Sequence, residues 1–373
     1  MSGFDQINAN QDIYAVILAG GSGTRFWPKS RHLLPKQLCK IGSNEQTMLE
    51  ITLNRLEGFI PPERRIIVTH QDQIEKTKEI AGRLCKHYLA EPEARNTANA
   101  LALAALHINH IHKGKNPPVM VSLHADHIIE KVPAFLKSLE NAIKVSQDGL
   151  LTLVGIVPEY PETGYGYIEQ GSALKAFAGG FNVASFREKP ELELATKYVA
   201  SKNFYWNAGM FVWRIDVIIE ELNRFLKPSM EKLAGLLKDA GSNGYNDVNP
   251  KKIAEVYSAL PKISIDNAVL EVSKKVAVVP ADIGWQDIGS WDALSHTFEP
   301  DRDGNLLFGN GCLIGSSNTT IDTDGPFVAA LGVKDHVIVH AGGAILVCPK
   351  EKAQDVKLIV DWLKGSAKHK TLV

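Results

Sequence analysis

The sequence has few cysteines, no long apolar run and almost no excess of either charge. Its four cysteines among 373 residues lack the spacing of zinc sites and of disulfide frameworks. The 41 basic and 42 acidic residues nearly cancel, so there is no basic surplus for nonspecific binding to nucleic acid. No stretch resembles a secretion signal or could span a bilayer. These absences favour a cytoplasmic protein with reduced cysteines, and they support neither a nucleic-acid partner nor a membrane partner.

The chain also lacks two common phosphate-binding motifs, although it carries a glycine-rich loop after the apolar run 14–18. Neither the Walker pattern nor the third glycine of the dinucleotide-binding pattern is present. Glycines nevertheless let backbone N–H groups approach an anion, and basic side chains add charge for phosphate oxygens. An ordinary glycine-rich turn is the alternative. We predict a nucleoside triphosphate site formed by Gly20, Gly21, Gly23, Thr24, Arg25 and Lys36.

Apolar runs alternate with helical patterns in the first half of the chain. The patterns predict buried strands at 66–68, 119–123 and 151–156, and helices at 74–87, 96–111 and 134–147. This alternation predicts an α/β fold whose mainly parallel sheet is covered by helices on both faces. Ligands bind such sheets beyond the carboxyl ends of the strands, which is where the glycine-rich loop lies.

The composition changes near residue 300. The chain becomes rich in Gly, Asn, Asp, Ser and Thr with short apolar runs, which is typical of brief strands and tight turns. An apolar stripe at helical spacing follows, formed by Val356, Ile359, Val360 and Leu363. We therefore predict one domain of residues 1–300 and a small β-rich C-terminal domain of residues 301–373 that ends in a helix.

Two aspartates are candidate ligands for Mg²⁺. Asp126 directly follows a predicted strand, and Asp287 lies in a turn between two tryptophans. Carboxylate oxygens suit Mg²⁺, which also binds substrate phosphates. A helix cap for Asp126 and a structural turn for Asp287 are the alternatives. His124 and His127 flank Asp126, but their spacing offers no fourth ligand for zinc.

Further segments combine polar residues with aromatic rings or glycines, which suits a sugar phosphate. Lys189 is a compact cation for a phosphate monoester, and Glu188 can accept hydrogen bonds from sugar hydroxyls. An exposed ion pair is the alternative for these two residues. The segment 162–167 alternates glycines and tyrosines, as either a sugar-binding loop or a hairpin turn would. Asn207 lies in an apolar run, where a buried amide needs hydrogen-bond partners.

Together these segments resemble the nucleotidyltransferases that make sugar nucleotides, and most closely the mannose-1-phosphate guanylyltransferases. The matching segments occur in the order GGSGTRFWP, PKQ, EPEARNTANA, ADH, ETGYGY, FREKP, WNAGMF and WQDIGSW. They cover roughly residues 14–295. The resemblance implies a Rossmann-like nucleotidyltransferase core and a short C-terminal β-domain that often forms a dimer, so a homodimer is expected.

The resemblance also implies a reaction. GMP would pass from GTP to mannose 1-phosphate, giving GDP-mannose and pyrophosphate, by Mg²⁺-assisted in-line attack of the sugar phosphate on the α-phosphorus. GTP and mannose 1-phosphate are the expected substrates. The implied residues are Arg25 and Lys36 at the triphosphate, Asn96 and Thr97 near guanine, and Asp126 and Asp287 at Mg²⁺. On the sugar side they are Tyr165, Gly166, Glu188 and Asn207 at mannose, and Lys189 at its phosphate.

Two other functions fit the residues. The first is the same chemistry with another sugar 1-phosphate or nucleotide, because guanine and mannose come from the resemblance alone. The second is a catalytically silent relative that regulates a partner. The presence of Arg25, Lys36, Asp126 and Asp287 argues against the second function.

Overall fold

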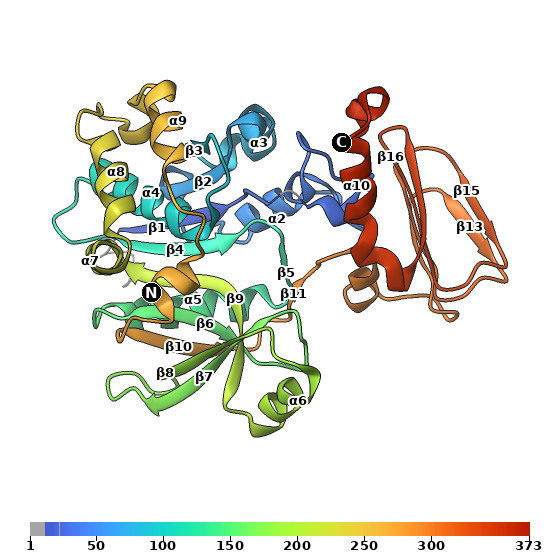
Figure 1. The fold of residues 1–373 in the computed structure, drawn as a ribbon. Coiled ribbons are helices and arrows are strands. Elements are labelled where there is room, and N and C mark those ends of the chain that lie inside the picture. Colours follow the sequence, from blue (N-terminus) through green and yellow to red (C-terminus); the bar gives the residue numbers. More distant parts are fainter. Residues whose placement is uncertain (1–11, 22) are drawn as a thin grey trace.

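The apolar run near the N-terminus forms a buried strand, β1 (Ile13–Leu18), inside a nine-stranded sheet. The computed structural model describes residues 12–21 and 23–373. Figure 1 shows the sheet and its helices on one side and a smaller β-rich domain on the other. The strand order is β3 (His87–Glu91), β2 (Arg65–His70), β1, β4 (Val119–His124), β9 (Phe204–Arg214), β6 (Leu151–Ile156), β10 (Val276–Ala281), β8 (Phe181–Glu188) and β7 (Gly166–Ala173).

The sheet has two halves that differ in strand direction. The strands from β3 to β4 are all parallel, and β6 is parallel to β10. The long strand β9 enters antiparallel between β4 and β6 and also pairs with β7. Near-continuous Val, Ile and Leu runs suit the parallel strands, because those strands are covered on both faces. The fold is therefore α/β with a mixed sheet whose N-terminal half is parallel.

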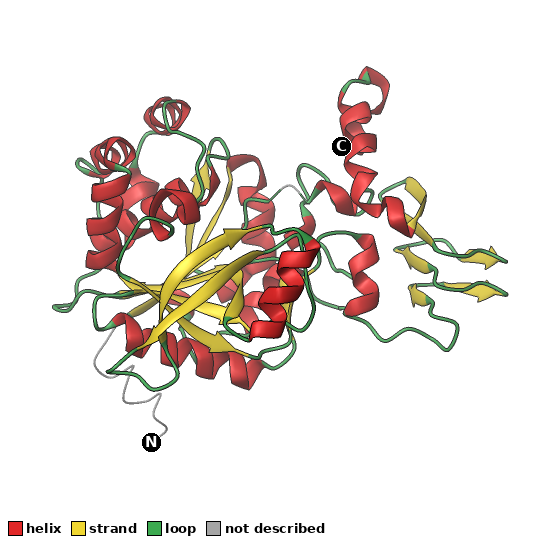
Figure 2. Cartoon of the chain, turned by 60° about the horizontal axis from the view of Figure 1, so that its bottom comes forward, coloured by secondary structure: helices red, strands yellow, loops and turns green. Residues whose placement is uncertain are grey.

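Helices cover both faces of the sheet (Figure 2). Alternate residues of β1 point to opposite faces, so Val16 and Ile17 belong to different apolar cores. One core is shared with α4 (Asn96–Ile111), α7 (Ile215–Phe225), α8 (Lys227–Leu237) and α9 (Pro250–Ser258). The other is shared with α2 (Met48–Asn54), α3 (Ile74–Ala81), α5 (Val132–Ser146) and α6 (Leu192–Ser201).

The predicted strands and two of the three predicted helices are confirmed as β2, β4, β6, α4 and α5. The predicted helix 74–87 is wrong in its last part. The helix α3 ends at Ala81 because Gly82 adopts a positive φ of 47°, and a short 3₁₀ turn leads into β3 at His87. The mixed composition of β3 gave no clear strand pattern.

The C-terminal domain consists of short strands and a closing helix. Its four-stranded sheet is formed by β12 (Leu306–Phe308), β14 (Thr320–Thr323), β16 (His336–Ala341) and β17 (Ala344–Pro349). A second sheet pairs β13 (Gly311–Ile314) with β15 (Val328–Leu331). The predicted helix is α10 (Val356–Lys364), which buries Val356, Val360 and Leu363 and leaves Ile359 36% exposed. In Figure 1, α10 lies between these strands and the core.

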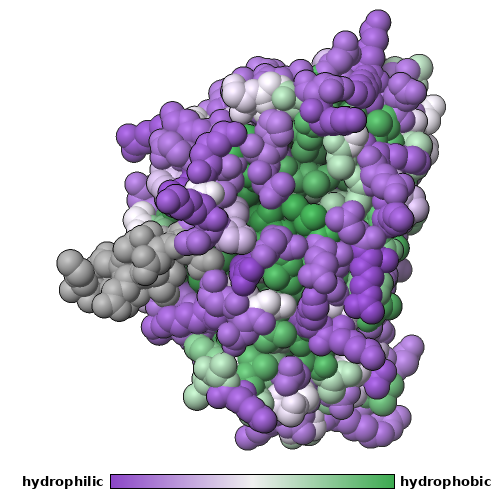
Figure 3. All heavy atoms as spheres, turned by 90° about the vertical axis from the view of Figure 1, so that its left-hand side faces the viewer, coloured by the Kyte–Doolittle hydropathy of each residue, from purple (hydrophilic) through white to green (hydrophobic). Residues whose placement is uncertain are grey.

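Apolar side chains reach the outer surface in both domains. The side of the core turned away from the C-terminal domain is mainly hydrophilic, with apolar side chains visible between polar ones (Figure 3). In the C-terminal domain, large apolar side chains on β13, β15 and β17 reach solvent. Within the described residues, none of the helices combines the length and apolarity needed to cross a membrane.

Candidate active site

A cavity of about 260 Å³ lies beyond the carboxyl ends of the parallel strands β1 to β4. The last residues of three of these strands, Leu18, Glu91 and His124, line it. The cavity brings together five residues predicted from the sequence, which are Gly20, Gly21, Asn96, Thr97 and Asp126. The strand ends therefore gather segments that are far apart in the sequence.

The glycine-rich loop is held in shape by the Pro-Lys-Gln segment. The Gln37 amide donates hydrogen bonds to the carbonyls of Ala19 (2.6 Å) and Gly21 (3.1 Å). Gly23 has a φ of +56°, which favours glycine. A Cβ on Gly23 would lie 2.5 Å from the Lys36 Cβ, so only glycine lets the loop close over this lysine.

Lys36 connects the two predicted metal ligands. Its Nζ lies 3.3 Å from Asp126 Oδ2 and 3.5 Å from Asp287 Oδ1, and only 4% of its side chain is exposed. A two-stranded ribbon creates this approach, because β11 (Trp285–Asp287) pairs antiparallel with β5 (His127–Ile129). Burial opposes ionisation of Asp126, but Lys36, His127 and His124 together hold the pKa of its carboxyl below the ordinary range.

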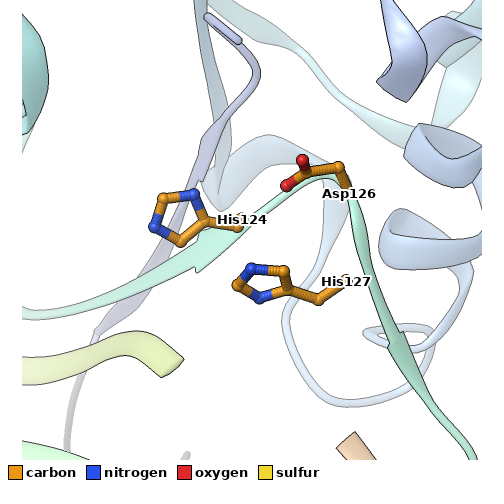
Figure 4. A group of neighbouring side chains, drawn as sticks. All are labelled: His124, Asp126 and His127. Carbon is orange, nitrogen blue, oxygen red and sulfur yellow. The ribbon is translucent and has the colours of Figure 1, made fainter. Parts of the chain in front are cut away.

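Two histidines lie beside Asp126. Figure 4 shows His124 at the end of β4, Asp126 in the following turn and His127 at the start of β5. One ligand atom from each of the three lies within 4.8 Å of the others. Burial and the neighbouring His124 lower the pKa of His127 to about 4, so its imidazole is neutral near pH 7.

The two carboxylates on either side of the Lys36 ammonium supply the hard oxygen donors that Mg²⁺ prefers. The three-residue group of His124, Asp126 and His127 does not include Asp287, so the described residues form no four-ligand zinc cluster there. Asp126 and Asp287 therefore fit a magnesium ion.

The predicted sugar-side residues come together on three neighbouring strands. Gly166 of β7 pairs with Glu188 of β8 and with Asn207 of β9. A Cβ on Gly166 would lie 2.7 Å from Glu188 Oε2, so glycine leaves room for this carboxylate. The Asn207 amide donates to Asp266 at 2.7 Å, and burial raises the pKa of Asp266. Sequence reasoning missed Asp266, which has no motif around it.

Tyr165 links the sugar-side group to the carboxylates. Its hydroxyl donates to the Asp287 carbonyl at 3.5 Å, and its ring contacts the rings of Trp206 and Trp285. Its carbonyl accepts from the backbone N–H of Lys189, which has a positive φ of 43°. The Lys189 ammonium lies 3.4 Å from Glu188, and 64% of its side chain is exposed.

Four residues of the predicted triphosphate site do not line the cavity, namely Gly23, Thr24, Arg25 and Lys36, and two of these side chains contact the C-terminal domain. Thr24 lines a separate cavity of about 100 Å³ against α10. Arg25 donates from Nη1 to Gln354 Oε1 in the C-terminal domain at 2.8 Å, and its guanidinium lies against Gly289. The chain turns at Gly23, which directs these side chains toward the C-terminal domain.

Comparison with known proteins adds to this geometry. Residues 14–303 match the family described as Nucleotidyl transferase, and residues 309–363 match the MannoseP isomerase/GMP-like beta-helix domain. The mannose-1-phosphate guanylyltransferase of Escherichia coli K12 is 38% identical over 371 residues, covering 97% of this chain and 75% of that protein. The chain belongs to the mannose-1-phosphate guanylyltransferase family. It is therefore an enzyme of the nucleotidyltransferase class.

Other members of the family agree with this assignment. A putative mannose-1-phosphate guanylyltransferase of Vibrio cholerae is 39% identical over 353 residues, covering 94% of this chain and 74% of that protein. A crystal structure from Thermus thermophilus, described as a mannose-1-phosphate geranyltransferase, superposes with a TM-score of 0.83 at 32% identity. That match covers 95% of this chain and all of the other.

Glu91 lines the cavity of this guanylyltransferase family member, but the sequence analysis did not predict it as a site residue. Glu91 ends β3 and is buried, and its Oε1 has no hydrogen-bond partner among the described residues. Burial raises the pKa of its carboxyl to about 8. Glu91 begins the segment that carries Asn96 and Thr97, and this position was its sequence signal, because β3 showed no clear strand pattern.

Proposed function

We propose that the protein transfers GMP from GTP to mannose 1-phosphate, forming GDP-mannose and pyrophosphate with Mg²⁺ as cofactor. The contact of Lys36 with both Asp126 and Asp287 carries the proposal. Asp126 lines the cavity at the glycine-rich loop, and the Asp287 carbonyl accepts from Tyr165 on the sugar side. In this arrangement the Lys36 ammonium lies where the nucleotide side and the sugar side meet, so that it can offset the negative charge of both substrates.

The proposed reaction needs no nucleophile from the protein. The second pKa of a phosphate monoester is near ~6, so the sugar phosphate is mostly a dianion at pH 7. One of its oxygens forms a bond to the α-phosphorus of GTP, while the bond from that phosphorus to the β-phosphate oxygen breaks and pyrophosphate leaves. Lys36 would offset the charge that gathers between the substrates, and the glycine-rich loop would orient the triphosphate.

Mg²⁺ would be held by the carboxylates of Asp126 and Asp287. When bound, it supplies positive charge to phosphate oxygens and helps align the attacking and leaving oxygens. The Lys36 ammonium lies within 3.5 Å of both carboxylates and holds them on one side of the site, which prepares the pair for a cation.

Glu91 supports guanine as the base. The Watson–Crick edge of guanine carries two neighbouring N–H donors, and a carboxyl oxygen can accept from one of them even when the carboxyl group is protonated. Glu91 provides a buried carboxyl oxygen that lacks a partner among the described residues, in the same cavity as Asn96 and Thr97. A base without these donors would leave the carboxyl oxygen unpaired, which costs binding energy.

We also propose a homodimer formed through the C-terminal domain. Among the described strands, β17 lies at the edge of its sheet, paired with β16 on one side, and it exposes Ile345 and Val347. An apolar edge strand of this kind is a surface that a second copy can cover.

The test of the proposed reaction is pyrophosphate release with Mg²⁺ across a grid of nucleoside triphosphates and sugar 1-phosphates, with products identified by mass. We expect GTP with mannose 1-phosphate to give GDP-mannose and to exceed every other pair. Pyrophosphate release with a different pair of substrates would support the mechanism and reject GTP and mannose 1-phosphate as the substrates. If folded protein releases no pyrophosphate with any pair, the proposed function is rejected.

A further inference from the structure

The segment that follows the glycine-rich loop is bound along its length by the C-terminal domain. Four alternate residues each make a polar contact with that domain. Arg25 donates to Gln354 (2.8 Å), Trp27 to the Leu372 carbonyl (2.7 Å), Lys29 to Asp322 (2.5 Å), and Arg31 to the carbonyls of Ala341 and Gly342 (both 3.3 Å). The C-terminal domain therefore contacts the segment that carries a predicted phosphate ligand.

Apolar side chains also join the segment after the glycine-rich loop to the C-terminal domain. Phe26 and Trp27 belong to one buried cluster with Trp291, with strands of the C-terminal sheet and with α10. The rings of Phe26 and Trp291 lie 5.0 Å apart, and the Trp291 indole donates to the Trp27 carbonyl at 3.1 Å. The backbone around Arg25 is thus fixed by buried side chains, while the Arg25 side chain itself is exposed.

Gln354 joins the two segments that carry the proposed chemistry. Its Oε1 accepts from Arg25, and its Nε2 donates to the buried hydroxyl of Ser290 at 2.6 Å. Ser290 in turn donates to the Asp292 carboxylate, so its hydroxyl is held in one direction. Ser290 lies three residues after Asp287, and the Arg25 guanidinium lies against the intervening Gly289. One amide side chain therefore ties the Arg25 segment to the Asp287 segment.

We propose that Gln354 is a positioning residue that orients the Arg25 guanidinium for the phosphates of the nucleotide. This proposal rests on the proposed function and on the triphosphate role of Arg25 that the sequence predicts. A free arginine side chain loses considerable rotamer freedom when it binds. The hydrogen bond to Gln354 uses one N–H of Nη1 and fixes the plane of the guanidinium before the nucleotide arrives, which leaves the other donors for phosphate oxygens. The C-terminal domain is then part of the nucleotide site.

The test compares two substitutions in the same turn of the C-terminal domain. Gln354→Met removes both hydrogen bonds with little change in volume, and Lys352→Met is the control because Lys352 is exposed and pairs with Asp355 nearby. By calorimetry we expect GTP binding to weaken about five-fold in Gln354→Met and to stay unchanged in the control. The KM for mannose 1-phosphate and the melting temperature should not change in either variant.

A double-mutant cycle separates orientation of Arg25 from a structural role. In an Arg25→Met background, Gln354→Met should cause no further loss of GTP binding, because the residue through which it acts is gone. The same loss in both backgrounds would overturn the proposal and assign Gln354 to the support of Ser290. GTP binding equal to or tighter than wild type in Gln354→Met would also overturn it.

The binding experiment is independent of turnover. Wild-type protein that binds GTP without forming product would reject the proposed function, while the comparison of the four variants would still decide the role of Gln354. If another triphosphate is the substrate, the same comparison is made with that nucleotide. Absence of binding to every triphosphate would reject both proposals.

Discussion

Gly23 and Lys36 pack so closely that a Cβ on Gly23 would lie 2.5 Å from the Cβ of Lys36. The Gly23→Ala change should therefore push Lys36 away from Asp126 and Asp287. We expect turnover to fall at least ten-fold, together with about 1–3 kcal/mol of stability from the clash and the positive φ. The control is Gly58→Ala, because Gly58 has a φ of 72° but no described atom within 4 Å of a Cβ. Equal turnover in the two variants would contradict the packing argument.

Removing either proposed metal ligand should stop the reaction without unfolding the protein. Asp126→Asn and Asp287→Asn each keep the side-chain volume but remove a charged oxygen donor, so we expect roughly a hundred-fold or greater fall in the rate of pyrophosphate release. Asp282→Asn is the control, because Asp282 is exposed and pairs with Lys131. Circular dichroism should show the same fold in all three, and near-normal rates in a folded variant would remove that aspartate from the site.

The buried carboxyl of Glu91 should make the empty protein less stable as the pH rises. In the unfolded chain this group loses its proton near pH 4.5, but in the folded protein it does so near pH 8. Between these values the folded state binds more protons, so stability falls with rising pH by at most about 1.4 kcal/mol per unit.

Urea unfolding at pH 5 and pH 8 measures this contribution. Glu91→Gln should lose less stability between the two values than wild type, whereas the exposed control Glu79→Gln should follow wild type. A pH dependence in Glu91→Gln that matches wild type would assign the effect to other groups.

Lys189 should act on the sugar phosphate and not on the nucleotide. Lys189→Ala removes an exposed cation beside Glu188, and we expect the KM for mannose 1-phosphate to rise about ten-fold while the KM for GTP stays constant. Lys202→Ala is matched to it, because Lys202 is also exposed and also has a positive φ. A rise in the KM for GTP alone would move Lys189 to the nucleotide side.

The proposed dimer depends on the exposed apolar side chains of β17. Val347 is 61% exposed, and Val347→Lys places a charge where a second copy would pack. We expect sedimentation to show a dimer for wild type and a monomer for the variant. Leu192→Lys is the control, because Leu192 is equally exposed but lies on α6 in the core domain. Wild-type association in Val347→Lys would place the interface elsewhere.

The sequence patterns predicted the strands and the site residues that depend only on neighbouring residues in the chain. The runs around β1, β4 and β6 are continuous and apolar, and the residues that follow β1 and β4 line the same cavity because parallel strands end at one edge of a sheet. The end of the helix after Ile74 was missed because the positive φ of Gly82 is a feature of conformation and not of composition.

The unpredicted features depend on contacts between distant residues. Arg25 meets Gln354 across 329 positions, and Asn207 meets Asp266 across 59. Gln354 lies in a charged segment with nothing to mark its partner, and no motif surrounds Asp266, so only the folded chain reveals these contacts. The strand β9 likewise pairs with three others, and no local pattern encodes such pairing.

The place of β6 in the sheet has a consequence for the growing chain on the ribosome. β6 is complete at Ile156, but both of its neighbours, β9 and β10, are synthesised later, and β10 ends only at Ala281. One edge of this apolar strand has no native partner until β9 is complete at Arg214, and the other has none until β10 is complete, and such edges attract incorrect pairings. The sheet closes only after long loops have been brought together, which slows folding. In this topology, protection from misassembly comes late, when most of the polypeptide has already left the ribosome.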